Sequence, residues 1–249
     1  PAVISNAGVF NTFGTLLPDH APHKAFYQNK LGQVQRSMAS VCLYIGLQDT
    51  AENLALPKTN FWIYPGADYR GQVENFLAAP DSHDIPLTYI SFPSAKDPSF
   101  AERYPGRATI EIVAPGPFEW YQDWADKPWG KRGEDYEAKK DAYAQRLLEK
   151  LYEKMPHLRG KVDYYELSTP LSTDYFCRYS TGEIYGLDHT PERFEQDWLK
   201  PKTRLPGLYL TGQDIMTCGV VGAMIGGLLT TVAVSGLKGL PLAKKMFVG

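Results

Sequence analysis

The chain has 249 residues, of which 43% are hydrophobic and 22% are charged. This composition is typical of a globular protein and excludes a disordered or fibrous chain. The formal net charge of −2 gives no reason to expect nucleic acid as a partner. Three widely spaced cysteines indicate neither a disulfide framework nor a zinc site, and we predict no metal site.

The N-terminal part of the sequence predicts one short strand followed by irregular structure. Residues 2–5 form an apolar run that stops at Asn6-Ala7-Gly8, which is typical of a buried strand ending in a tight loop. Residues 10–32 carry two prolines and are predicted to be irregular. Because Pro1 opens what reads as the middle of a fold, we expect the chain to be part of a longer protein.

The middle of the chain predicts strands with a short helix between them. Four stretches are rich in β-branched and aromatic residues and bounded by turn-forming residues; they are 41–47, 60–64, 87–92 and 108–113. In the last stretch, Ile110 and Ile112 alternate with Thr109 and Glu111, which predicts one covered face and one more polar face. Residues 71–79 are predicted to form a short helix.

Residues 134–155 predict an amphipathic helix, because apolar side chains recur mostly every three or four positions. Acidic residues open this helix, lysines close it and Pro156 ends it. Residues 162–167 predict another strand. Residues 168–206 are predicted to be loop-rich, with a short helix at 191–199, and Leu208-Tyr209-Leu210 predicts a short strand.

The segment after this last strand has the clearest pattern of a binding site. The strand stops at Gly212, Gln213 and Asp214 follow, and a glycine-rich helix is predicted to begin near Gly219. The start of a helix offers free N–H groups and the positive end of its dipole to an anionic ligand. Gly219 and Gly222 would let a flat ring or a pyrophosphate approach the backbone, and Asp214 could hydrogen-bond a sugar or ribityl hydroxyl.

Two segments leave alternatives open. Residues 215–237 carry no charge and are long enough to span a bilayer, but a buried helix that packs closely on a sheet has the same composition. Basic residues lie beside Trp120, Trp124 and Trp129; this loop fits either contact with lipid headgroups or a packed surface loop before the helix.

Several stretches together resemble a known family. They are Val-Ile-Ser-Asn-Ala-Gly at 3–8, Ile-Pro-Leu-Thr-Tyr-Ile-Ser-Phe-Pro-Ser-Ala-Lys-Asp-Pro at 85–98, Phe-Glu-Trp at 118–120, Gly-Lys-Arg-Gly-Glu-Asp-Tyr-Glu at 130–137, Tyr-Gly-Leu-Asp-His at 185–189 and Leu-Tyr-Leu-Thr-Gly-Gln-Asp-Ile-Met-Thr-Cys-Gly at 208–219. The chain resembles the phytoene desaturase and carotenoid isomerase family of FAD-dependent oxidoreductases. Within this family it is most similar to the all-trans-retinol 13,14-reductase (retinol saturase) branch. The resemblance runs from residue 1 to about 235 and would correspond to the C-terminal half of such a protein.

The resemblance implies an α/β fold of mixed α+β character with two domains. Residues 1–12 and 171–249 would form part of an FAD-binding, Rossmann-like domain. Residues 13–170 would form an inserted substrate-binding domain, built on a mixed β-sheet with covering helices. The N-terminal βαβ unit of the family, with its GxGxxG motif, is missing from this sequence. The missing half, or another chain, would be needed to complete the FAD site.

The resemblance also implies which residues lie at the cofactor and favours a buried helix over a membrane span for residues 215–237. The predicted FAD-binding residues are Ser5, Asn6, Ala7, Gly212, Gln213, Asp214, Ile215, Gly219, Val220, Val221, Gly222 and Ala223. A proton donor is needed near the flavin, and Tyr185 and His189 are the candidates because they precede the FAD motif. NAD(P)H is a candidate reductant.

The implied function is saturation of a C=C bond in a lipophilic polyene such as all-trans-retinol. Two alternatives stay open, a flavin-dependent carotenoid cis–trans isomerase and a non-catalytic, flavoprotein-derived subunit of a larger assembly. Aromatic residues of the inserted domain would either line an apolar tunnel or belong to its core; they are Tyr44, Phe61, Trp62, Tyr64, Tyr89 and Phe92. Because polyenes reside in lipid, we expect peripheral membrane association, at the endoplasmic reticulum or in plastids.

Overall fold

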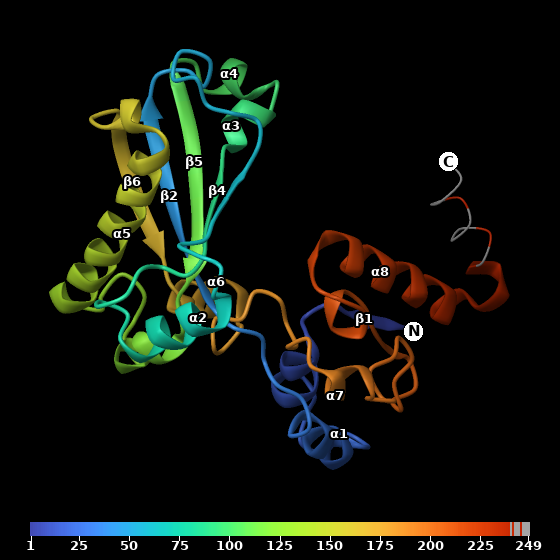
Figure 1. Cartoon of the computed structure of the whole chain (residues 1–249). Helices are drawn as coiled ribbons and strands as arrows, with labels where there is room; N and C mark the ends of the chain where they lie inside the picture. Colours follow the sequence, from blue (N-terminus) through green and yellow to red (C-terminus); the bar gives the residue numbers. More distant parts are fainter. Residues whose placement is uncertain (240, 242–244, 246–249) are drawn as a thin grey trace. The chain divides into compact units, whose positions relative to one another are not determined.

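The computed structural model describes residues 1–239, 241 and 245, and the chain divides into two compact units (Figure 1). The outer unit comprises Pro1–Met38 and Glu183–Gly249, and the inserted unit comprises Ala39–Gly182. The sequence placed the boundaries after residues 12 and 170, whereas the compact units meet after residues 38 and 182. The predicted mixed α/β class is confirmed, because helices, parallel strands and antiparallel strands are all present.

The inserted unit is built on a five-stranded antiparallel sheet in the order β3-β4-β5-β2-β6. Its strands are β2 (Ser40–Gln48), β3 (Phe61–Ile63), β4 (Thr88–Ser91), β5 (Arg107–Pro115) and β6 (Val162–Ser168). All five predicted strands of this region are confirmed, because each is a short β-rich run bounded by turn residues.

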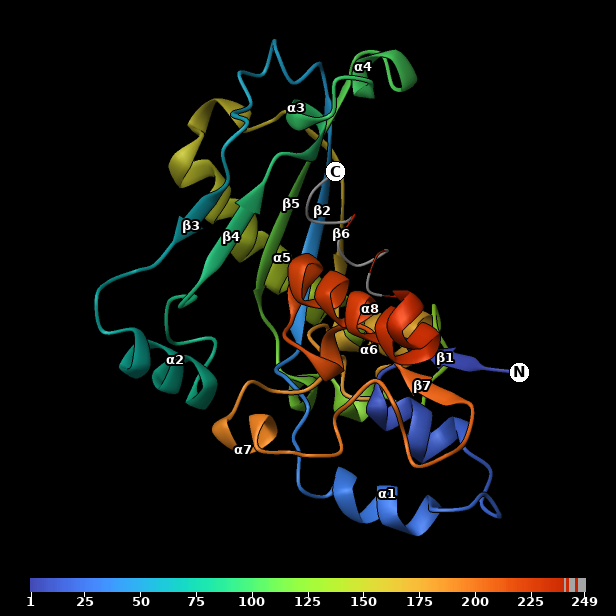
Figure 2. The same ribbon diagram turned by 90° about the vertical axis from the view of Figure 1, so that its right-hand side faces the viewer.

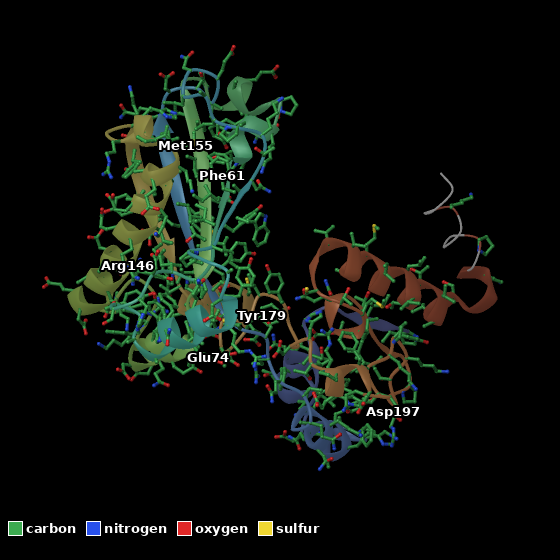
Figure 3. The ribbon with its side chains drawn as sticks, in the orientation of Figure 1. Phe61, Glu74, Arg146, Met155, Tyr179 and Asp197 are labelled. Carbon is green, nitrogen blue, oxygen red and sulfur yellow. The ribbon has the colours of Figure 1, made fainter. Side chains whose placement is uncertain are left out.

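One face of this sheet packs against α5 (Glu134–Lys154) and forms the main core (Figures 1 and 2). Leu43 on β2 lies opposite Ile112 on β5, and both are fully buried together with Leu147 of the helix. Each such side chain contributes roughly 1.5–3 kcal/mol when it leaves water. Figure 3 labels Arg146 within α5 and Met155 directly after its end. The amphipathic helix predicted at 134–155 is therefore confirmed.

The inserted unit also contains short helices and turns. They are α2 (Tyr69–Ala78), α3 (Pro93–Lys96), α4 (Phe100–Arg103), the 3-10 turns Phe118–Trp120, Gln122–Trp124 and Pro156–Leu158, and α6 (Pro170–Cys177). The sequence predicted loop where α6 lies. This helix begins at Pro170 and is capped by reciprocal hydrogen bonds between Thr169 and Ser172. Trp120 and Trp124 pack on the core, whereas Trp129 is exposed.

The outer unit contains a two-stranded parallel sheet, β1 (Val3–Ser5) and β7 (Leu208–Leu210). Its helical segments are the π-helix Phe10–Leu16, α1 (Lys24–Leu31), α7 (Pro191–Phe194), the 3-10 turn Gln213–Ile215, α8 (Gly219–Ser235) and the 3-10 turn Gly236–Lys238. The prediction that residues 10–32 are irregular is wrong. Phe13 and Tyr27 stack with ring centroids 3.7 Å apart, and this buried contact joins the π-helix to α1.

Helix α8 is the predicted glycine-rich helix, and it packs through small residues. Gly222, Gly226 and Thr230 are buried along one side of it, while Val220 and Met224 are exposed. Among residues 1–239, 241 and 245, no helix has both the length and the apolar character needed to cross a membrane.

The two segments of the outer unit that adjoin the inserted unit are hydrogen-bonded to each other. The Ser37 N–H donates to the Gly186 carbonyl at 2.8 Å, and the Asp188 N–H donates to the Gln35 carbonyl at 2.9 Å. Arg36 adds an ion pair at 3.0 Å with Glu183, whose side chain is 2% exposed. The outgoing and returning parts of the chain are thus held together within the outer unit.

Candidate functional site

Every residue predicted to bind cofactor or donate a proton lies in the outer unit, around the carboxyl ends of two parallel strands. Ser5 lies opposite Leu210, and the Thr211 N–H donates to the Ser5 carbonyl at 2.9 Å. The carboxyl ends of parallel strands meet at one edge of a sheet, which is where α/β folds bind ligands. The pairing therefore brings the loop after β1 and the loop after β7 together.

The loop after β1 presents one exposed polar side chain. The Ser5 hydroxyl lies 2.7 Å from that of Thr12, and the Ala7 N–H donates to the Ser5 oxygen at 3.4 Å. Asn6 is exposed and lies against Gly212, where an added β-carbon would overlap the Asn6 side-chain oxygen. Gly212 has φ +89°, so this close approach and the backbone conformation both favour glycine.

Helix α8 is held directly on the end of β7. An added β-carbon at Gly226 would overlap the carbonyl oxygen of Gly212. Thr230 is 2% exposed, and its hydroxyl donates to the Leu210 carbonyl at 2.7 Å. These contacts fix the direction in which the helix starts.

The start of α8 is open and fits a flat or anionic group. Gly219 has φ +84°, and no atom lies within 4 Å of an added β-carbon there. Val220 and Val221 are 86% and 64% exposed, and no side chain caps the first N–H groups of this 17-residue helix. These free N–H groups and the helix dipole attract negative charge, so the residues present are compatible with FAD.

Two other predicted cofactor residues face the protein rather than this open space, and a third is half-buried. A β-carbon at Gly222 would overlap the Thr217 carbonyl, so Gly222 permits close packing instead of an approach by a ring. Ile215 is 9% exposed and packs in the core of the outer unit, and Ala223 is half-buried.

Asp214 connects three segments of the outer unit. Its side chain is 5% exposed, and its two carboxylate oxygens accept hydrogen bonds from the N–H groups of Val9 at 2.8 Å and Leu187 at 3.1 Å. Burial raises the pKa of Asp214, although these two hydrogen bonds and the charge of Arg193 oppose the shift. The visible role of this carboxylate is structural, and its predicted contact with a ribityl hydroxyl stays a prediction.

Sequence reasoning missed Arg193, which organises the loop between β7 and α8. Its guanidinium is 3% exposed and donates to the carbonyls of Gln213 at 2.8 Å, Met216 at 3.1 Å and Leu187 at 3.1 Å. Burial lowers its pKa. The carbonyls of Gln213 and Met216 lie 20 and 23 residues away in sequence, so no local motif marks this residue. The Thr190-Pro191 start of α7 was the only signal.

The two predicted proton donors have different surroundings. The His189 Nε2 accepts a hydrogen bond from the Cys218 N–H at 2.9 Å, directly before α8. Burial and the neighbouring charge of Arg193 lower the His189 pKa, so the ring is neutral at pH 7 and its Nε2 is an acceptor. Tyr185 is 46% exposed, and its hydroxyl has no hydrogen-bond partner among the described residues. The predicted role of either residue as proton donor stays a prediction.

The aromatic residues predicted for a tunnel divide between the two faces of the sheet in the inserted unit. Phe92 is fully buried, and Phe61 packs on the core beside it. Trp62 is 60% exposed and lies 4.7 Å from Tyr89 between ring centroids. Tyr44 is 46% exposed on the same face. This face carries exposed aromatic side chains, and Lys96 at the end of α3 contacts Ser91 on it at 2.9 Å, whereas the other face is core.

Comparison with known proteins shows what the chain is similar to. No family model matches the chain. The chain is 38% identical over 240 residues to a Macaca fascicularis protein named all-trans-retinol 13,14-reductase, which covers 94% of this chain and 39% of that protein. The Homo sapiens protein of that name is 37% identical with the same coverage. A 4,4'-diapophytoene desaturase of Staphylococcus aureus is 30% identical over 41% of this chain and 19% of the desaturase.

These similarities confirm the resemblance, and the chain belongs to the all-trans-retinol 13,14-reductase family, of whose members it spans about two fifths of the length. The similarity to the desaturase is more distant and covers a smaller part of the chain. One Danio rerio relative, 32% identical over 91% of this chain and 38% of that protein, is named an inactive all-trans-retinol 13,14-reductase.

Proposed function

We propose that this chain is part of an FAD-dependent oxidoreductase that saturates a C=C bond of a polyene such as all-trans-retinol. The observation that carries the proposal is the meeting of the Asn6 loop, the Gly212 loop and the open start of α8 at one edge of a parallel sheet. The names of the similar proteins support the reaction and the substrate.

Some residues of this chain would bind the cofactor, and others would position the loop beside it. The free N–H groups at Gly219, Val220 and Val221 would face the cofactor, and Asn6 and Gly212 would border it. When bound, FAD supplies a hydride to one carbon of the conjugated chain. Arg193 and His189 hold the loop that precedes α8, and the Tyr185 hydroxyl would deliver a proton to the neighbouring carbon. NAD(P)H would supply the electrons.

We also propose peripheral contact with a membrane, at the endoplasmic reticulum or in plastids. Trp129, Tyr175 and Phe176 form an exposed aromatic cluster in the inserted unit, and the Trp129 and Tyr175 rings stack 5.4 Å apart. Exposed aromatic side chains of this kind suit the interface between lipid and water. Replacement of all three by serine should reduce flotation of the full-length protein with phosphatidylcholine vesicles, whereas the exposed Leu16→Ser should not.

Mass spectrometry of the full-length protein tests the proposed function first. Native and denaturing spectra of one sample should differ by the mass of FAD. Incubation of the flavoprotein with NAD(P)H and all-trans-retinol should then give a product two mass units heavier. Tyr185→Phe should slow this turnover and leave FAD content unchanged.

Other outcomes would support the alternatives. An isomerised polyene of unchanged mass would indicate a carotenoid cis–trans isomerase. A protein that carries no flavin would contradict the proposed function and indicate a non-catalytic subunit, a possibility to which the relative named inactive gives weight.

A further inference from the structure

The face of the five-stranded sheet opposite α5 has two adjacent rows of side chains of different chemistry. We call it the open face. Strand pairing places Trp62, Tyr89 and Val113 opposite one another on β3, β4 and β5, and Cys42 continues this row on β2. The next row runs from Ser91 through Glu111 to Tyr44. The first row is mainly apolar and the second is polar.

Glu111 is unusual because it is a carboxylate at the centre of the open face. It lies on β5, the middle strand of the sheet, and is half-buried. Among residues 1–239, 241 and 245 it makes no hydrogen bond and no ion pair. The ammonium of Lys96 is engaged with Ser91 at 2.9 Å and with Asn60. A half-buried carboxylate without a protein partner can take its hydrogen-bond donor from water or from a ligand.

The side chains beside Glu111 do not supply that donor. The Tyr44 hydroxyl lies beside the Cys42 thiol on the same strand. Burial raises the pKa of Cys42 to about 11 and that of Tyr44 to about 12, and the charge of Glu111 adds to both shifts. Both groups therefore stay protonated and neutral at physiological pH, and Glu111 is the carboxylate that lies between Ser91 and Tyr44.

We propose that Glu111 accepts a hydrogen bond from the hydroxyl of an elongated apolar alcohol whose hydrocarbon chain lies on Trp62, Tyr89 and Val113. These three residues span neighbouring strands about 4.8 Å apart, which gives an apolar track of roughly 10 Å. A pure hydrocarbon on this track would desolvate Glu111 and leave it unpaired, whereas an alcohol satisfies it. Glu111 thus selects a polyene alcohol over a polyene hydrocarbon, and this inference rests on the proposed function for the substrate class.

Ligand binding to the full-length protein tests the assignment without depending on turnover. Dissociation constants for all-trans-retinol and for axerophthene, the hydrocarbon that lacks its hydroxyl, can be measured by quenching of tryptophan fluorescence. Glu111→Leu removes the acceptor, and Glu111→Gln keeps the shape but removes the charge. The matched control is Glu74→Gln on α2, an exposed glutamate that is labelled in Figure 3. Circular dichroism verifies that each variant is folded.

The proposal predicts a loss that depends on the ligand. Glu111→Leu should weaken retinol binding about ten- to a hundredfold, the range for a hydrogen bond to a charged group, and should leave axerophthene binding unchanged or tighter. Glu111→Gln should weaken retinol binding less, and Glu74→Gln should change neither constant. Equal losses for both ligands, or wild-type retinol affinity in Glu111→Leu, would overturn the role of Glu111.

The same data separate this inference from the proposed function. If the wild-type protein binds and reduces retinol while the Glu111 variants bind it normally, only the role of Glu111 fails. If the wild-type protein binds neither ligand, both the role of Glu111 and the proposed polyene substrate fail.

Discussion

The two glycines in the middle of α8 provide a matched test of how this helix is seated. A β-carbon at Gly226 would overlap the Gly212 carbonyl oxygen, which is backbone and cannot rotate away. A β-carbon at Gly227 would meet only the Thr211 hydroxyl, at 4.0 Å. Both changes to alanine gain the same helix propensity of roughly 1 kcal/mol, so the difference between them isolates the overlap.

The magnitude follows from two terms. Forcing a methyl group into a packed contact costs about 1–3 kcal/mol. A shift of α8 that relieves the overlap would also lengthen the 2.7 Å hydrogen bond from Thr230 to Leu210, which is worth roughly another 1 kcal/mol. Gly226→Ala should therefore be less stable than Gly227→Ala by about 2–4 kcal/mol.

Urea unfolding of the full-length protein measures this difference, provided that the two variants have the same dependence on denaturant. Bound FAD per chain is a second readout, because the start of α8 moves with the helix. Gly227→Ala should match or exceed the wild type in both measurements. Equal stability of the two alanine variants would refute the inferred contact between α8 and the end of β7.

Three further predictions concern the polar groups around this loop. Arg193→Lys should lower the free energy of unfolding by about 1.5–3 kcal/mol, because a lysine cannot reach the same carbonyls in a fork, and the exposed Arg70→Lys should not. Burial raises the folded-state pKa of Asp214. The free energy of unfolding of the wild type should therefore rise relative to that of Asp214→Asn as pH falls through this pKa toward 3.8. A difference in unfolding free energy that does not change with pH would contradict this. For His189 the folded-state pKa is lowered, so its contribution is complete above pH 6.5 and lost as pH falls through the folded-state pKa. Urea titrations between pH 7.5 and 5.5 should show that the free energy of unfolding falls less in His189→Gln than in the wild type. Equal losses of unfolding free energy in the two proteins would argue against the hydrogen bond from Cys218 to His189.

The sequence predicted those elements whose pattern is local. Strands of the inserted unit and α5 could be recognised because apolar side chains repeat with the period of the element. The π-helix and α1 could not, because their stability comes from Phe13 and Tyr27 stacking across a proline-containing loop. The capping box of α6 has Ser172 at the third helical position, where Glu or Gln is the usual sequence signal of a helix start. The start of this helix was therefore not recognised.

The candidate site was predictable where glycine marks the backbone, and less so where side chains act at a distance. The sequence marked Gly212 as the end of the strand and Gly219 as the start of the helix, and both have positive φ in the structure. Gly222 faces Thr217, and only the packing of the helix reveals this orientation. Arg193 was missed because a guanidinium that binds backbone carbonyls leaves no trace in the sequence of its partners.

The discontinuity of the outer unit has a consequence for biosynthesis. Ala39–Gly182 is synthesised as one continuous stretch. Strand β1 cannot pair with β7 until residue 210 has emerged from the ribosome. Domains generally fold as units during translation, so the inserted unit should reach its native state first. The pairing of Ser37 and Asp188 with their partners would then join the two halves of the outer unit around an already folded insert. A nascent chain arrested shortly after Gly182 should therefore already protect the five-stranded sheet from proteolysis.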